Sequence, residues 1–285
     1  MPDWFDERSP IAPPIASTLG ALGAFALLAA LVAVDPGGLV GRLDSALSAF
    51  VREPAAPLFE RSMIAVTLLG DFPLTVTLMI GFVALLAAAR LPALALHALF
   101  LFASTKLIVS LCKVGIDRAR PLELYPGGDV YSFPSGHAAS AAVLLGAVAT
   151  LFLVREVRPA GAAGAARAFA RDATAVPTGR QPSSISGSPA AIGTTLAFSL
   201  PAAAVALSRV RLGAHWPTDV IASLLLVAAL LPSFAWHLRR HVQRGVPLPS
   251  RLRWIALGGL TGGWIAYLVL FGASASRYYA GASPG

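Results

Sequence analysis

The sequence predicts an all-α membrane protein, a bundle of transmembrane helices, from three observations. Of its 285 residues, 56% are hydrophobic and only 13% are charged, whereas soluble domains carry roughly 25% charged residues. The mean hydropathy is +0.71. The apolar residues are gathered into blocks long enough to cross a hydrocarbon core of about 30 Å as helices, which takes roughly 20 residues. We therefore expect a single polytopic helix bundle in lipid.

Seven apolar blocks are the expected spans, each placed to within a few residues. They are Thr18–Val34, Pro73–Ala89, Pro92–Val114, His137–Val154, Ala190–Leu207, Thr218–His237 and Trp254–Ala273. Between the first two, Leu43–Val51 and Leu58–Leu69 are predicted to be short helices at the interface or against the bundle, and the second is alternatively a re-entrant segment. Residues 1–10 are too acidic for a secretory leader, so the first block is expected to remain as an anchor.

Arginines predict the orientation of the spans. They concentrate after the fourth and the sixth span, and loops rich in arginine stay in the cytoplasm. The loops Asp117–Phe133 and Val210–Pro217 then face the other side of a plasma or inner membrane. Residues 155–189, which lack apolar periodicity, are expected to form a flexible basic cytoplasmic insertion. We divide the chain into a transmembrane core, residues 1–238, and a basic loop with an extra C-terminal span, residues 239–285.

The charge and the cysteine content narrow the expected partners. A net charge of +8 would suggest nucleic acid in a soluble protein, but here the arginines lie mainly between spans. An anionic lipid in the bilayer, and not nucleic acid, is therefore the expected partner. Cys112 is the only cysteine, so no intrachain disulfide can form.

The first polar cluster lies at the outer end of the third span, from Lys113 to Arg120 and Pro121. A helix would place Lys113 and Arg120 two turns apart on one face, where both can hold one anion. Pro121 is expected to end the span at Arg120 and release the guanidinium into a pocket. The alternative is that both side chains simply reach the lipid headgroups.

The second cluster is Pro134-Ser135-Gly136-His137, directly before the fourth span. The backbone N–H groups of Ser135, Gly136 and His137 are expected to be unpaired donors at a helix start, which binds phosphate readily. Gly136 allows close approach of an anion, and His137 is suited to protonating a leaving alkoxide. The alternative is a serine cap beside an incidental interfacial histidine.

The third cluster is Ser208-Arg209, His215 and Asp219, with the sixth span beginning between the last two. His215 and Asp219 are about one helical turn apart, so the carboxylate can accept the Nδ1 proton of His215 and leave Nε2 as a nucleophile toward phosphorus. Arg209 offers a planar fork for phosphate oxygens. The alternative is a structural Arg–Asp pair with a packed histidine.

Together, the three clusters resemble the signatures of the type 2 phosphatidic acid phosphatase (PAP2) superfamily in residue type and spacing. The motifs run from Lys113 to Asp219, and the six-helix core of the family would cover about Thr18 to His237. The seventh span and the insertion lie outside that pattern. The resemblance implies a membrane enzyme that removes phosphate from a lipid without a metal or another cofactor.

By this resemblance, Lys113, Arg120, Ser135, Arg209 and the Gly136 amide hold the phosphoryl group. His215 attacks phosphorus and Asp219 orients it. His137 protonates the leaving oxygen and then activates water. The expected substrates are phosphatidic acid, phosphatidylglycerophosphate or a polyprenyl diphosphate such as undecaprenyl diphosphate, at the outer surface of the membrane.

Three alternatives stay open on the sequence. The phosphohistidine can pass its phosphate to a sugar or lipid hydroxyl, which makes the protein a phosphotransferase. The soluble vanadate haloperoxidases share the constellation, although seven apolar spans argue against that branch. A non-catalytic lipid-binding or transport protein is disfavoured because ionisable groups within membranes usually mark function.

Overall fold

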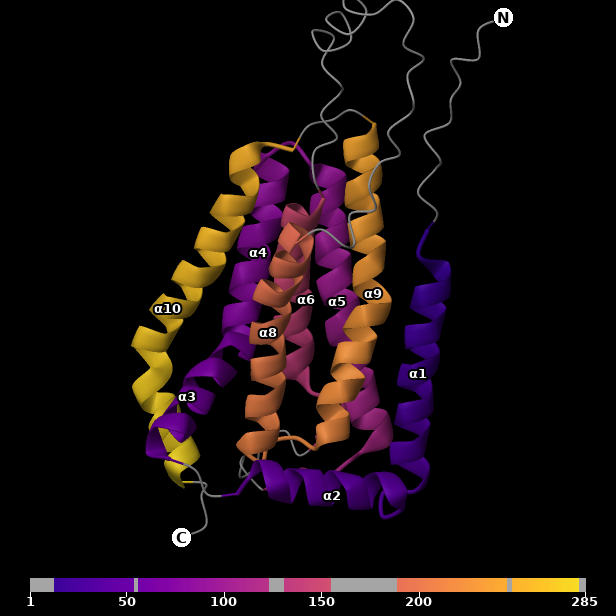
Figure 1. The fold of residues 1–285 in the computed structure, drawn as a ribbon, viewed down its shortest axis with the longest axis vertical. Helices are drawn as coiled ribbons and strands as arrows, with labels where there is room; N and C mark the ends of the chain where they lie inside the picture. Colours follow the sequence, from indigo (N-terminus) through magenta and orange to yellow (C-terminus); the bar gives the residue numbers. More distant parts are fainter. Residues whose placement is uncertain (1–12, 54–55, 123–130, 155–188, 245–247, 282–285) are drawn as a thin grey trace, which may run out of the picture.

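The all-α prediction is confirmed by the computed structural model, which describes residues 13–53, 56–122, 131–154, 189–244 and 248–281. In order, its helices are α1 (Ile15–Val34), α2 (Leu39–Val51), α3 (Pro57–Thr67), the short 3-10 helix η1 (Leu68–Gly70), α4 (Phe72–Ala88), α5 (Pro92–Ile116), α6 (Gly136–Leu153), α8 (Pro189–Arg211), α9 (Pro217–Gln243) and α10 (Ser250–Gly281). The long helices run along one axis and form a bundle (Figure 1). The expected insertion at 155–189 lies almost wholly outside the described residues.

The helices match the predicted spans closely. Among the described residues, six helices are each long and apolar enough to cross a membrane: α1, α5, α6, α8, α9 and α10. The predicted second span is α4, which qualifies only together with the segment before it: Pro57–Gly70 and Phe72–Ala88 form a pair bent by 47°. The predicted interface helix at Leu58–Leu69 is therefore the first half of a broken span or a re-entrant segment. The chain is a multi-pass membrane protein.

The bend between η1 and α4 has a local cause. Asp71 has an extended backbone, with φ −60° and ψ 141°, and Pro73 stands in the first turn of α4. Proline lacks the N–H that would continue the preceding helix, but it fits the first turn of a new one. The helix therefore ends at Gly70, and a new helix begins at Phe72 in another direction, with Asp71 at the corner.

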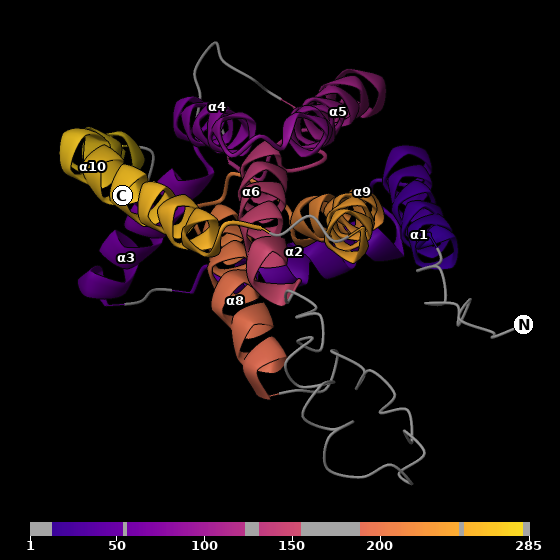
Figure 2. The same cartoon turned by 90° about the horizontal axis from the view of Figure 1, so that it is seen from above.

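Helix α6 is the centre of the bundle, with α4, α5, α8 and α9 arranged around it (Figure 2). Its sequence is rich in alanine, and 72% of the window that would cross the membrane is buried, against 11% for α1. In lipid, helices associate through close packing of small residues. Gly146 shows this: a Cβ atom there would lie 2.4 Å from Leu231 Cδ2 of α9. Small side chains on α6 thus allow its neighbours to pack around it.

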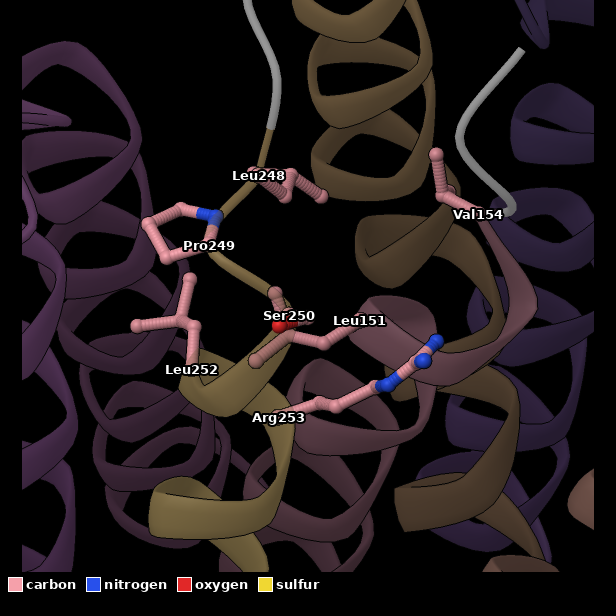
Figure 3. Close-up of a pocket in the computed structure, with 7 residues that line it drawn as sticks. All are labelled: Leu151, Val154, Leu248, Pro249, Ser250, Leu252 and Arg253. Atoms are coloured by element: carbon pink, nitrogen blue, oxygen red, sulfur yellow. The ribbon is translucent and has the colours of Figure 1, made fainter. Parts of the chain in front are cut away.

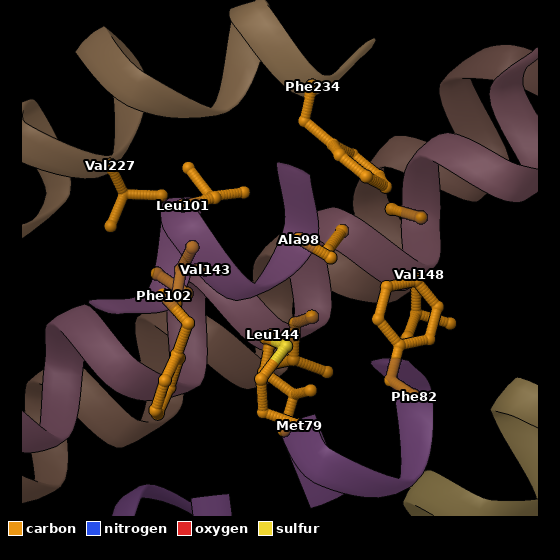
Figure 4. Packing of buried hydrophobic residues seen from close by; sticks show 14 of the residues in the cluster. Met79, Phe82, Ala98, Leu101, Phe102, Val143, Leu144, Val148, Val227 and Phe234 are labelled. Carbon is orange, nitrogen blue, oxygen red and sulfur yellow. The ribbon is translucent and has the colours of Figure 1, made fainter. Parts of the chain in front are cut away.

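A continuous apolar core joins α4, α5, α6 and α9 (Figure 4). Met79 and Phe82 of α4, Leu144 of α6 and Phe234 of α9 belong to this cluster, and the rings of Phe82 and Phe234 are 6.4 Å apart edge to face. The core fixes the relative positions of the helices whose ends carry the polar clusters.

The two ends of the bundle differ in chemistry. At the end where α6 begins, α2 lies across the bundle (Figure 1) and contacts α8 and α9. At the opposite end, where α6 finishes, Leu151, Val154 and Arg253 line a hollow of only about 20 Å³ (Figure 3). Such a volume holds about one water molecule. A wider cavity of about 340 Å³ at the same end is lined by the C-terminal turns of α4 and the start of α10, including Arg90 and Arg251.

His97 of α5 lies away from the polar clusters. Its Nδ1 is 2.9 Å from His237 Nδ1, and its Nε2 is 3.1 Å from Ser233 Oγ. His97 is thus a hydrogen-bonded, half-buried histidine within a span.

Candidate active site

The three sequence clusters meet at one end of the bundle, where α5 and α8 finish and α6 and α9 begin. His215 lies in the short connection between α8 and α9. It is close enough to four other charged or titratable residues of the clusters for their charges to act on it: Arg209, Arg120, Lys113 and His137. The structure thus brings together residues that are more than 100 positions apart, as the sequence analysis expects.

His215 and Asp219 form a buried pair at the start of α9. The His215 Nδ1 is 3.4 Å from Asp219 Oδ2, and the two residues are 1% and 0% exposed. Asp219 Oδ2 also accepts a hydrogen bond of 2.8 Å from the Trp216 backbone N–H. This arrangement favours the tautomer with the proton on Nδ1, so that Nε2 carries the lone pair.

Arg118 links Asp219 to a second carboxylate, that of Asp44. Arg118 donates from Nη1 to Asp219 Oδ1 at 2.7 Å and from Nη2 to Asp44 Oδ2 at 2.6 Å. Asp44, on α2, also accepts a 2.9 Å hydrogen bond from the Thr218 backbone N–H and one from the Thr218 hydroxyl. Nothing in the local sequence pattern of α2 indicates that Asp44 becomes buried, so this support could not be predicted from the sequence.

Arg209 is the most deeply buried cation of the site. It is 1% exposed at the end of α8, and its Nη1 donates to Thr67 Oγ1 of α3 at 2.9 Å. Burying a guanidinium in a membrane helix bundle is costly unless the guanidinium is paired with an opposite charge. Arg209 is therefore a candidate for binding an anion.

One expectation about Lys113 and Arg120 is wrong. They do not share a helix face, because α5 ends at Ile116 with Asp117 in the left-handed region at φ 50°. Arg120 lies beyond the helix, next to Ala119, which forms an isolated antiparallel β-bridge with Tyr131. The loop, and not the helix, brings Arg120 to the site: its Nη1 donates to the Ala214 carbonyl at 2.7 Å and lies 3.3 Å from His215 Nε2.

Lys113 reaches the same loop from the last turn of α5. Its Nζ donates to the Tyr131 carbonyl at 2.6 Å. The Ser132 N–H in turn donates to the Arg118 carbonyl at 2.8 Å. Lys113 is thus hydrogen-bonded to Tyr131, the bridge partner of Ala119, which precedes Arg120. Both cations therefore lie at the same end of the bundle.

The start of α6 corrects a second expectation. The Ser135 N–H is not an unpaired donor, since it donates to the Asp219 carbonyl at 3.1 Å, and the buried Ser135 hydroxyl caps α6 at the Ala138 N–H. At Gly136 an added Cβ would meet only Val109 Cγ1, at 3.8 Å. The protein itself therefore leaves open space beside Gly136, where an anion can approach the backbone.

His137, in the first turn of α6, has an acidic partner that the sequence analysis did not name. Its Nε2 is 2.8 Å from Oδ1 of Asp71, the residue at the corner between η1 and α4. The other oxygen of Asp71 accepts a 3.1 Å hydrogen bond from the Tyr267 hydroxyl of α10. A lone aspartate between two apolar segments was a usable signal, because ionisable residues beside spans usually mark function.

The pKa of His215 lies well below its usual range, first because burial disfavours the charged imidazolium and then because Arg209, Arg120 and Lys113 repel it. If neutral His215 is the reactive form, kcat/KM is lost only as the pH falls through this lowered pKa, below about 6.5. We expect Arg120→Met to move this acidic limb to higher pH by removing one repelling charge.

Profiles of kcat/KM between about pH 4 and pH 8 for both proteins measure this shift. The substrate titrates equally in both experiments, so the difference belongs to the enzyme. An acidic limb at the same pH in both proteins would contradict this electrostatic account.

An apolar cavity of about 430 Å³ lies beside the site, between α3, α6, α8 and α10. Leu69, one of its lining residues, precedes Gly70, where an added Cβ would lie 2.9 Å from His137. The volume falls within the range of roughly 300–1,000 Å³ that is usual for ligand pockets. No cluster of three or more metal-ligating side chains occurs in the part of the chain that the structure describes.

Comparison with known proteins agrees with this geometry. The PAP2 superfamily model matches residues 94–244, which is more than half of the chain and includes all three clusters. The fold is similar to the crystal structure of a transmembrane PAP2-type phosphatidylglycerolphosphate phosphatase from Bacillus subtilis, with a TM-score of 0.54 and 22% identity over 81% of this chain and 98% of that one. A search of curated proteins gave no significant match. The family match and the arrangement of its motifs together show that this chain belongs to the PAP2 superfamily.

Proposed function

We propose that this chain is an integral-membrane lipid phosphatase that works through a phosphohistidine on His215. The observation that supports this most directly is the buried His215–Asp219 pair, with Nδ1 3.4 Å from the carboxylate and Nε2 facing Arg120. A histidine held in this tautomer among cations is suited to attack a phosphate dianion. Membership of the PAP2 superfamily supports the phosphatase activity.

In the first step, His215 Nε2 attacks phosphorus and the bond to the lipid oxygen breaks. His137 gives its proton to that oxygen, so the lipid alcohol or lipid monophosphate leaves neutralised. Asp219 stabilises the cationic phosphoimidazole through Nδ1–H. In the second step, His137 takes a proton from water, the hydroxide attacks phosphorus, and His215 is released with inorganic phosphate.

The cations hold the phosphoryl oxygens through both steps. Arg209, Arg120 and Lys113 act on the charge at His215, and the space beside Gly136 exposes the backbone at the start of α6. Preorganised donors stabilise the developing charge without reorganisation. Every charge in this scheme comes from side chains, so we propose a reaction that needs no metal ion.

The apolar cavity supports a lipid as the substrate. It is lined almost entirely by apolar side chains and lies beside η1, which packs against His137. A phosphate bound among the cations would thus have its tail directed into this cavity. The substrate classes we propose are phosphatidic acid, phosphatidylglycerophosphate and polyprenyl diphosphate. The similar Bacillus subtilis protein is a phosphatidylglycerolphosphate phosphatase, which puts the second of these first in the test.

The arginine distribution supports a site at the non-cytoplasmic surface of a cell membrane. In the structure, the connection from α5 to α6 is at the site end, and α6 runs from there to the other end, where the arginine-rich residues 155–189 follow. Labelling of a single cysteine at exposed Val114, in a Cys112→Ser background, should therefore occur from outside intact cells.

The central experiment is phosphate release by purified protein with excess EDTA, from the three lipid classes and from 4-nitrophenyl phosphate. Release that persists in EDTA supports hydrolysis without a metal, and the rates rank the substrates. Product analysis with added lipid and sugar alcohols separates hydrolysis from phosphotransfer. No release from any substrate, with or without an acceptor, would contradict the proposal.

Filling the cavity tests the lipid assignment. Ala204 lines the cavity on α8, and Ala204→Phe should raise KM for a long-chain lipid phosphate roughly tenfold, about 1.4 kcal/mol, by taking the space of the tail. The value of kcat/KM for 4-nitrophenyl phosphate should stay within about twofold. Exposed Ala203 is the matched control on the same helix, since Ala203 does not line the cavity. An equal loss with both substrates would place the tail elsewhere.

A further inference from the structure

We propose that Asp71 and Tyr267 are positioning residues for His137, so that the last helix takes part in proton transfer. Asp71 holds the His137 ring, and Tyr267 holds Asp71. The inference rests on the proposed function in one respect, the assignment of proton transfer to His137. It gives α10, which lies outside the range matched by the family model, a part in the reaction.

The geometry at Asp71 is unusual for its place in the chain. Aspartate at the N-cap of a helix normally accepts a hydrogen bond from the first turn of that helix. Asp71 is the N-cap residue of α4, yet its side chain makes no capping hydrogen bond. Instead, Oδ1 is 2.8 Å from His137 Nε2 and Oδ2 accepts from the Tyr267 hydroxyl at 3.1 Å. Both oxygens are thus directed to the site and not to the helix.

Close packing brings this carboxylate to the histidine. At Gly70, an added Cβ would lie 2.9 Å from His137 Cβ, 2.9 Å from the His137 carbonyl oxygen and 3.0 Å from Val205 Cγ1. Only glycine lets η1 approach the first turn of α6 this closely. The next residue is Asp71, so the contact between η1 and α6 places the carboxylate beside the ring.

The contact determines which nitrogen of His137 acts. With Nε2–H donated to Asp71, Nδ1 is the atom that gives a proton to the leaving oxygen and later takes one from water. Asp71 stays ionised throughout and transfers no proton, as in other Asp–His pairs. Its negative charge also offsets Arg209 and Lys106, whose charges act on His137, and so stabilises the protonated ring that the first step needs.

Tyr267 fixes the second oxygen of Asp71 from α10. Its ring packs against Phe271, with centroids 4.6 Å apart, which orients the hydroxyl. Without this hydrogen bond the carboxylate can rotate away from His137. The Tyr267→Phe variant keeps the ring contact and removes only the hydroxyl, so it tests the hydrogen bond alone.

The test compares two leaving groups in single turnovers. An alkyl phosphate needs a proton on its leaving oxygen, whereas 4-nitrophenyl phosphate releases a stable anion that does not. For Asp71→Asn, the rate of alcohol release from dodecyl phosphate should fall about 10- to 100-fold, part of the roughly 10²–10⁴-fold that general acid catalysis supplies. The rate of 4-nitrophenol release should fall less than about threefold. Tyr267→Phe should show the same selectivity with a smaller loss, about 3- to 10-fold.

Asp35, an exposed aspartate at the end of α1, is the control: Asp35→Asn should leave both rates unchanged. Equal losses with the two substrates in Asp71→Asn would indicate a merely structural role and overturn the proposal, as would no loss with either. Failure of the proposed function looks different, because then wild type releases neither alcohol, or releases both equally well after His215→Ala.

Discussion

Replacing His215 by alanine should reduce phosphate release by at least about 10⁴-fold, the scale on which removal of a catalytic nucleophile acts. His215 is 1% exposed, and its ring lies against both Asp219 and Arg120. The measurement is phosphate release with excess EDTA, on the substrate that gives the highest wild-type rate.

Labelling with ³²P tests the role of His215 directly. Wild type quenched during turnover of a ³²P-labelled substrate should carry phosphate that is stable to base and labile to acid, as phosphohistidine is, and His215→Ala should carry none. His97→Ala is the matched control, because it removes a hydrogen-bonded histidine at the other end of α5 and should keep both activity and label. Activity within tenfold of wild type in His215→Ala would refute the phosphohistidine mechanism.

Asp219→Asn should have the second largest effect, a loss in kcat of about 10²–10⁴-fold, because an amide disrupts the tautomer of His215. Each oxygen of Asp219 accepts from a donor: Oδ1 from Arg118 at 2.7 Å, and Oδ2 from the Trp216 N–H at 2.8 Å. An asparagine NH₂ would meet a donor in either orientation. The ring of His215 would then lose its orientation and the counter-charge for its phosphorylated state.

Asp44→Asn separates catalysis from structure. It weakens the second ion pair of Arg118, because Asp44 Oδ2 accepts from Arg118 Nη2 at 2.6 Å. Asp44 accepts hydrogen bonds from Arg118 and Thr218 and not from His215. Both variants should lower thermal stability, as breaking a buried ion pair does. Only Asp219→Asn should also lower kcat by more than about 100-fold at a temperature where both proteins are folded. Similar kcat values for the two variants would mean that Asp219 is structural.

The sequence alone was sufficient for the fold class and for naming most of the residues that the structure brings together at the candidate site. Apolar blocks of helical length show the spans, because a chain in lipid must satisfy its backbone hydrogen bonds internally. The motifs from Lys113 to Asp219 indicate the PAP2 family and predict phosphate chemistry, because their charged residues stand at the ends of those blocks. His215 and Asp219 are one helical turn apart in the sequence, so their contact follows from local geometry.

Only the tertiary structure decided the rest, because those contacts join residues that no local pattern connects. The Asp117 cap ends α5 early and leaves Arg120 to a loop. Asp44 reaches Arg118 only because α2 lies across the end of the bundle. Asp71 meets His137 and Tyr267 only because a bent span packs against α6 and α10. Helix periodicity predicts which residues share a face, but which helices become neighbours is settled by the packing of side chains such as Gly70 and Gly146 against partners distant in sequence.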